Sequence, residues 1–137
     1  MTKEIWINLP VKDLTRSREF FTKIGFNVHP HNENNPSMAG MSIGEKKVMI
    51  MLVLEETFKT FIRAEIADAS QGSEVILSFD AESREEVDEI ARKAEAAGGT
   101  LFGKPEEIQG WMYGCGFIDP DGHRWNALYM DFSKLPK

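Results

Sequence analysis

The sequence predicts an α+β fold built from two βαβββ modules. Ile5, Ile7 and Leu9 alternate with Trp6 and Asn8, which is the two-residue period of a strand with one apolar face. A helical pattern and three further strand patterns follow this strand, and the same order returns in the second half of the chain. In such a repeat, paired units bury a sheet face that one unit alone would expose.

The first module is expected over about residues 4–62 and begins with a strand at 4–11. Asp13 is expected to cap the next helix, because its carboxylate can accept from the free amides of the first turn, and Gly25 to end it. The strand predicted at 47–54 is apolar almost throughout, which indicates burial on both faces. The other elements predicted for this half are strands at 26–29 and 38–43 and a short helix at 55–62.

The second module is expected over about residues 73–132, after a connector at 63–72 that lacks a strong pattern. Ser83 and Glu86 form a capping box at the start of a helix that is expected to end at Gly98-Gly99. The strand patterns of this half carry Val75, Leu77 and Phe79 before the helix and cover 100–103, 111–118 and 123–130 after it.

Length and composition restrict the possible partners. A chain of 137 residues, 42% of them hydrophobic, fits one domain over 1–137. The net charge of −6 leaves no basic stripe, so we expect no nucleic-acid partner. No apolar run is long enough to cross a bilayer and the first residues lack a signal-peptide apolar region, so we expect a cytoplasmic protein with no membrane partner. The single cysteine, Cys115, excludes an intrachain disulfide and is expected to be a small buried hydrophobe.

Three short motifs carry a family resemblance. They are Leu9-Pro10-Val11-Lys12-Asp13-Leu14, Phe20-Phe21 with Gly25-Phe26, and the hairpin turn Asp119-Pro120-Asp121-Gly122. Together with the repeated element order, they resemble the vicinal oxygen chelate superfamily, the fold of glyoxalases, bleomycin-resistance proteins and extradiol dioxygenases. The resemblance covers Ile5 to Met130. It implies that two curved mixed sheets enclose a cleft between the modules, and that two chains pair as a homodimer.

The resemblance also implies four metal-ligand positions, one on the first and one on the last strand of each module. The matching positions are Trp6, a residue of the apolar strand at 48–54, Ile76 and Asn126. None of them offers the imidazole or carboxylate that a divalent metal prefers, so the sequence predicts neither a metal site nor another cofactor. The alternative is a divalent metal ion held by Glu74 with Asn126 and a histidine from elsewhere in the chain. His29 and His31 form a His-x-His pair beside an Asn- and Pro-rich segment, where surface positions are expected.

A ligand-binding cleft with an apolar and aromatic wall is predicted from the strand alternation and the resemblance together. Neutral amides and hydroxyls in that wall would orient a small molecule, and methionines near the strands would adapt to its shape. The residues expected in the cleft are Trp6, Asn8, Met51, Glu74, Ile76, Ser78, Tyr113, Asn126 and Leu128. Side chains that instead fill a closed core are the alternative.

The predicted function is metal-free binding of a small, largely apolar molecule, similar to that of bleomycin-resistance proteins. The first alternative is a metal-dependent lyase or dioxygenase of the glyoxalase type with an atypical metal site. The second is a domain whose cleft is closed by core side chains and whose role is assembly with a partner.

Overall fold

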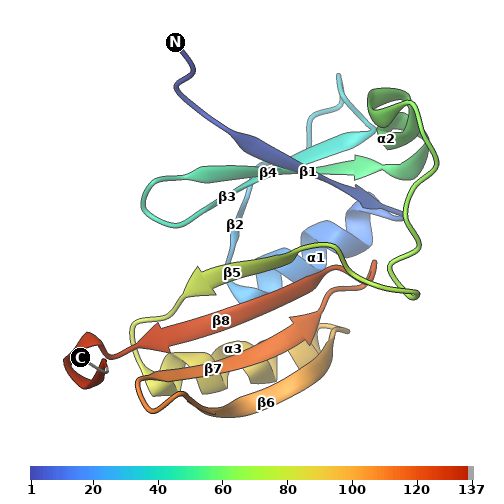
Figure 1. Ribbon diagram of the computed structural model, residues 1–137. Coiled ribbons are helices and arrows are strands. Elements are labelled where there is room, and N and C mark those ends of the chain that lie inside the picture. The colour runs from blue at the N-terminus through green and yellow to red at the C-terminus, as the bar shows by residue number, and fades with distance from the viewer. Residues whose placement is uncertain (136–137) are drawn as a thin grey trace. The chain divides into compact units, whose positions relative to one another are not determined.

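The computed structural model describes residues 1–135 and confirms the α+β class, with two four-stranded mixed sheets (Figure 1). The chain forms two compact units, one over Met1–Asp68 and one from Ala69 onward. Each unit contains a strand, a helix and three further strands, which is the repeat expected from the sequence. Within residues 1–135, no helix has the length and apolar character needed to cross a membrane.

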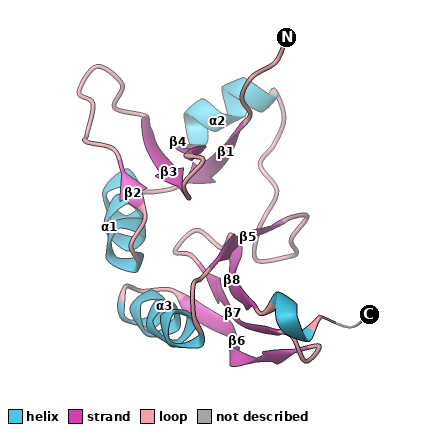
Figure 2. Cartoon of the chain, turned by 90° about the vertical axis from the view of Figure 1, so that its left-hand side faces the viewer, coloured by secondary structure: helices cyan, strands magenta, loops and turns pink. Residues whose placement is uncertain are grey.

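The first unit is built around the sheet β1-β4-β3-β2, in which β1 runs parallel to β4 and the other neighbours are antiparallel. Helix α1 packs against one face of this sheet (Figure 2). The elements are β1 (Trp6–Val11), α1 (Leu14–Ile24), β2 (Asn27–Val28), β3 (Met38–Ile43), β4 (Val48–Leu54) and α2 (Glu55–Ile62).

The caps of α1 are those expected from the sequence. The Asp13 carboxylate accepts from the Arg16 amide at 3.1 Å, and Gly25 ends the helix with a φ of 106°, a conformation that favours glycine. The helix buries Phe20 and Phe21, whose rings meet edge to face with centroids 5.1 Å apart. These rings form the centre of the first unit's core.

Two expectations for this unit were wrong. Ile5 does not contribute to the apolar face of the first strand, because β1 begins only at Trp6, and the Ile5 side chain is 80% exposed. The strand β4 is not buried on both faces: Ile50 and Leu52 are buried, whereas Met49 and Met51 are only partly buried. One face of this sheet is therefore covered by a helix, and part of the other remains accessible.

The second unit repeats the design around the sheet β5-β8-β7-β6, in which β5 runs parallel to β8. Helix α3 packs against one face of β6, β7 and β8. The elements are β5 (Ile76–Asp80), α3 (Arg84–Ala96), β6 (Thr100–Ile108), β7 (Met112–Ile118), β8 (Arg124–Met130) and the short 3₁₀ helix η1 (Phe132–Lys134).

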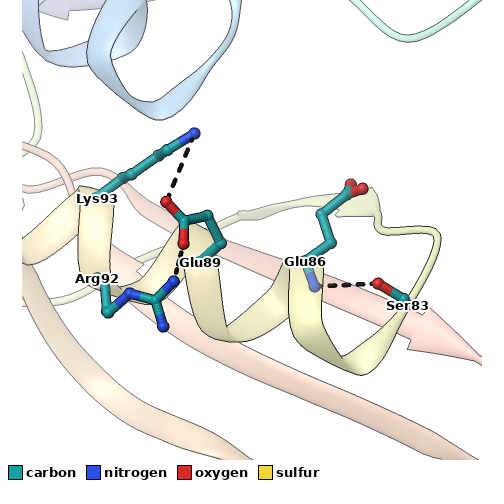
Figure 3. A network of polar contacts seen from close by, with 5 residues as sticks. All are labelled: Ser83, Glu86, Glu89, Arg92 and Lys93. Carbon is teal, nitrogen blue, oxygen red and sulfur yellow. Dashed lines mark hydrogen bonds and ion pairs between the residues drawn. The ribbon is translucent and has the colours of Figure 1, made fainter.

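Helix α3 has the predicted N-cap. The Ser83 hydroxyl accepts from the Glu86 amide at 3.1 Å, and one turn later the Glu89 carboxylate pairs with both Arg92 and Lys93 (Figure 3). All of these groups lie at the surface. They fix where the helix begins and keep its outer side in contact with water, but they contribute little to the stability of the core.

Two features of the second sheet differ from those predicted from the sequence. Strand β6 continues to Ile108, well beyond the expected 100–103, and its pairing with β7 shifts register twice, which interrupts the regular alternation used to recognise a strand. Val75 precedes β5 and is exposed, so it does not extend the apolar face of Leu77 and Phe79 as expected.

A buried carboxylate holds the hairpin between β7 and β8. Asp119 is 4% exposed, and its Oδ1 accepts from the amides of Asp121 and His123 at 2.9 and 3.0 Å. Its Oδ2 accepts from Trp125 Nε1 at 3.0 Å, and the turn closes with the Gly122 amide donating to the Asp119 carbonyl. Asp119 therefore joins the turn backbone to the main aromatic side chain of the second core. Cys115 lies in the same core, and its predicted burial is confirmed.

Burial makes the contribution of Asp119 to stability depend on pH. Loss of hydration raises the pKa of this carboxyl above its ordinary value of 3.8, although the charge of His123 and the hydrogen bond from Trp125 oppose the rise. A raised folded pKa means that the folded chain binds the proton more tightly than the unfolded chain does. The contribution of Asp119 is therefore complete below the unfolded pKa and decreases as pH rises through the folded pKa.

We expect urea unfolding of the wild type and Asp119→Asn, measured from about pH 4 upward, to show this decrease of stability with rising pH. Asparagine does not titrate, so the stability advantage of the wild type should shrink as the pH increases. A difference that grows with pH would show that the hydrogen bonds to the carboxylate outweigh its burial.

Candidate functional site

Each sheet has a face opposite its packed helix, which we call its open face. In the first unit, strand alternation places Trp6 and Asn8 of β1 on this face, beside Met49 and Met51 of β4. Trp6 is 56% exposed, although a tryptophan is seldom placed in water without a reason. Together the four side chains present an aromatic ring, two thioethers and one amide on a single surface.

A polar group borders these side chains on β2 and β3. Asn27 Nδ2 donates to the Ser42 hydroxyl at 3.1 Å, and His29 Nε2 lies 3.3 Å from the same oxygen. His29 was expected at the surface, and its place in this polar group was not predicted from the sequence. The signal that could have found it is the spacing of Asn27 and His29, which places both side chains on one face of an extended segment.

The second unit presents four of the expected residues on its open face. Ile76 and Ser78 of β5 lie beside β8, where Ser78 pairs in register with Asn126, and Leu128 follows on the same side. Ile76 is 49% exposed. Arg124, which pairs with Ile76, and Asp80, which pairs with Leu128, add a charge at each end of this face. Between them the surface is aliphatic with one hydroxyl and one amide, a mixture in which apolar contact provides affinity and neutral groups provide orientation.

The Asn126 amide has an unusual environment. Its Oδ1 is buried and has no hydrogen-bond partner among residues 1–135. An unpaired buried acceptor costs about 1–3 kcal/mol, and such groups in native proteins are few and commonly functional. A ligand or a water molecule that donates to this oxygen would recover that energy.

An aromatic ring and a cation flank the Asn126 amide. The Phe102 ring covers Gly116 so closely that a Cβ at this position would overlap it, and Gly116 is the neighbour of Asn126 across the sheet. The Arg124 guanidinium lies over the same ring, 4.7 Å from its centroid. Phe102 was not expected at the site, because the pairing irregularities of β6 conceal the face to which it belongs. Arg124 was not expected there either, although the regular alternation of β8 places it on the same face as Asn126.

Two residues of the expected set do not belong with the others. Tyr113 lies on the helix side of its sheet, because its hydroxyl donates to Asp88 of α3 at 2.7 Å, and this bond raises the pKa of the tyrosine. Glu74 is exposed and precedes β5, so no strand holds it at a fixed height on the sheet. Tyr113 therefore does not lie on the open face, and no strand fixes Glu74 there.

The donor chemistry of the open faces does not fit the divalent metal that the family resemblance implies. Trp6 pairs in register with Met49, which places an indole beside a thioether. In the second unit Ile76 pairs with the cationic Arg124, and the Asn126 amide lies two residues further along β8. Residues 1–135 contain no cluster of three or more His, Cys, Asp or Glu side chains suited to a metal ion. Hard and borderline divalent ions require several carboxylate or imidazole donors, and these positions supply only one neutral amide oxygen.

Comparison with known proteins identifies the family. A family model described as the Glyoxalase/Bleomycin resistance protein/Dioxygenase superfamily matches residues 5–127. Among curated proteins, none matches the chain.

Three solved structures illustrate the likeness. A hypothetical protein from S. aureus is 31% identical with a TM-score of 0.83, and the match covers 94% of each chain. A glyoxalase/bleomycin resistance protein/dioxygenase family enzyme from Burkholderia phytofirmans PsJN is 23% identical, with 91% of this chain and 96% of that chain covered and a TM-score of 0.74. A glyoxalase-related enzyme from Fulvimarina pelagi is 19% identical, with 94% and 88% covered and a TM-score of 0.79. The matched family model spans most of the chain, and this protein belongs to the glyoxalase/bleomycin resistance protein/dioxygenase superfamily.

Proposed function

We propose that this protein binds a small, largely apolar molecule on the open faces of its sheets, without a divalent metal. The observation that carries the proposal is the exposure of Trp6 and Ile76 on faces whose opposite sides form the cores. Large apolar side chains in that position contribute little hydrophobic free energy unless a second apolar surface removes them from water. The neutral groups of Asn8, Ser78 and Asn126 can orient a weakly polar ligand, and the charged side chains of Arg124 and Asp80 border the face that carries Ser78 and Asn126.

A titration with a panel of aromatic and amphipathic compounds, followed by tryptophan fluorescence, tests the proposal. A ligand of about 20 non-hydrogen atoms at ~0.3 kcal/mol per atom would bind with about 6 kcal/mol, which is a Kd of tens of micromolar. We expect Trp6→Phe to remove most of the fluorescence response and Trp6→Ala to weaken binding about tenfold, since an aromatic contact contributes ~1.4 kcal/mol.

The matched control is Trp111→Phe, because Trp111 packs on Phe132 of η1 with ring centroids 5.9 Å apart. This variant should leave both affinity and response unchanged. The proposal fails if no compound of the panel binds below about 1 mM, or if Trp6→Ala binds as tightly as the wild type. A full equivalent of zinc, nickel, manganese or iron in protein purified without chelator would instead support a metal-dependent lyase or dioxygenase.

A further inference from the structure

Arg124 places a cation on the open face of the second sheet with no carboxylate beside it. The cross-strand register sets it between two apolar neighbours, Ile76 of β5 and Ile118 of β7. Its guanidinium lies over the Phe102 ring, and among residues 1–135 it forms no ion pair. Asp80, on the same face, lies four residues further along the pairing, a distance of about 13 Å. The guanidinium is permanently charged, so it offers a positive charge that the neighbouring side chains do not balance.

The unpaired acceptor of Asn126 lies next to this cation. Arg124 and Asn126 are two residues apart in a regularly paired strand, so their side chains leave the same face about 7 Å apart. The Phe102 ring borders both of them: it lies 4.7 Å from the guanidinium carbon and also covers Gly116, the cross-strand neighbour of Asn126. Because β8 is an inner strand of the sheet, paired on both sides, the spacing of the two groups is fixed by the backbone (Figure 1).

These groups specify complementary features of a ligand. A guanidinium matches a carboxylate through two parallel N–H bonds, and one positive charge balances one negative charge. The Asn126 Oδ1 atom can only accept, so its partner must be an O–H or N–H group. The Phe102 ring and the Ile76 side chain, 43% and 49% exposed, offer contact to an apolar body. Doubly charged phosphate would keep an unbalanced charge beside these apolar groups.

We infer that the open face of the second sheet binds a small organic carboxylate that has an apolar body and one hydroxyl or N–H donor. The carboxylate pairs with Arg124, and the donor hydrogen-bonds to Asn126 Oδ1. This inference rests on the proposed function, because it names the chemical class of the molecule bound on that face. It adds a charge requirement that the exposure of Trp6 and Ile76 does not contain.

Three matched compounds test the two contacts separately. 4-Hydroxybenzoate carries the charge and the donor, methyl 4-hydroxybenzoate lacks the charge, and 4-methoxybenzoate lacks the donor. Each is titrated into ¹⁵N-labelled wild-type protein at constant ionic strength, and the backbone amides of β8 and the Asn126 side-chain amide are followed by NMR. We expect 4-hydroxybenzoate to bind about tenfold more tightly than its methyl ester and about threefold more tightly than 4-methoxybenzoate, the ratios typical of a charged and a neutral hydrogen bond.

Two variants and a control assign these preferences to residues. Arg124→Gln should abolish the preference for the acid over its ester, whereas Asn126→Leu should abolish only the preference for the hydroxyl over the methoxy compound. The matched control is Arg92→Gln, which removes the same charge from the same unit. Arg92 is exposed on α3, which packs against the opposite face of the sheet, and it pairs with Glu89. This control should bind all three compounds as the wild type does.

The inference is overturned if the ester binds the wild type as tightly as the acid, or if Arg124→Gln and Arg92→Gln bind the acid equally well. It is also overturned if acetate or inorganic phosphate binds as tightly as 4-hydroxybenzoate, because Arg124 would then attract any anion. Thermal unfolding checks the fold of each variant, and the comparison of acid with ester needs no variant. Equal binding of acid and ester leaves the proposed function standing, whereas the absence of binding by every compound removes both.

Discussion

Replacement of Trp125 by alanine is expected to lower the free energy of unfolding by about 3–5 kcal/mol. Trp125 is only 2% exposed, and it stacks on Phe117 with ring centroids 6.3 Å apart. The edge of Phe79 meets it at 6.3 Å, and its indole nitrogen donates to Asp119. Alanine would leave both a cavity and an unpaired buried carboxylate oxygen. Urea denaturation followed by circular dichroism measures the change.

The matched control is the same substitution at Trp6, on the open face of the other unit. Trp6→Ala removes an identical side chain, but one that is mostly exposed, so its cost should stay at or below about 1 kcal/mol. Comparable losses for the two variants would contradict the assignment of Trp125 to the core and Trp6 to the candidate site. Because domains are stable by only about 5–15 kcal/mol, Trp125→Phe provides a milder variant if the alanine protein does not fold.

Replacement of Asp119 by alanine should cost about 3 kcal/mol. Hydrogen bonds to a charged group contribute about 1.5–3 kcal/mol each, and relief from the burial of the charge offsets part of their loss. The substitution leaves the amides of Asp121 and His123 and the Trp125 indole without their shared acceptor. Urea unfolding at neutral pH measures the effect, which should appear in the midpoint rather than in the slope.

Asp80→Ala is the control for this prediction. Asp80 ends a strand of the same unit, but its side chain is exposed, so its loss should change stability by about 0.5 kcal/mol or less. If Asp119→Ala were as mild as Asp80→Ala, the Asp119 carboxylate would contribute no more than an exposed turn residue. The Asp-Pro-Asp-Gly segment would then determine the hairpin through its backbone preferences alone.

The sequence predicted the fold well because most of its signals are local. The helix caps at Asp13 and Ser83 and the glycine at 25 depend on residues within one turn, so tertiary contacts do not need to be known. The alternation in β1 likewise separates Trp6 from Leu9 without any knowledge of the helix that covers Leu9. The errors at Ile5 and Val75 have a shared cause: strands end where pairing ends, and both residues lie just before the first paired position.

The candidate site was predicted less completely. Strand alternation divides side chains between two faces of a sheet, but it does not show which of the two faces a helix covers. Tyr113 lies between Met112 and Gly114, and its bond to Asp88 of α3 places it on the helix side. His29 and Ser42 are separated by 13 residues, so their contact depends on the pairing of β2 with β3. The three donors that converge on Asp119 were likewise invisible until the hairpin was closed. Contacts of this kind are tertiary information.

The division of each strand between a covered face and an accessible one has an evolutionary consequence. Leu9 and Leu52 maintain the fold, whereas Trp6 and Met49 on the same two strands contribute little to it. Mutations can therefore accumulate at the accessible positions while the scaffold persists. A descendant of this chain could change its preferred molecule by exchanging a few side chains at a small cost in stability.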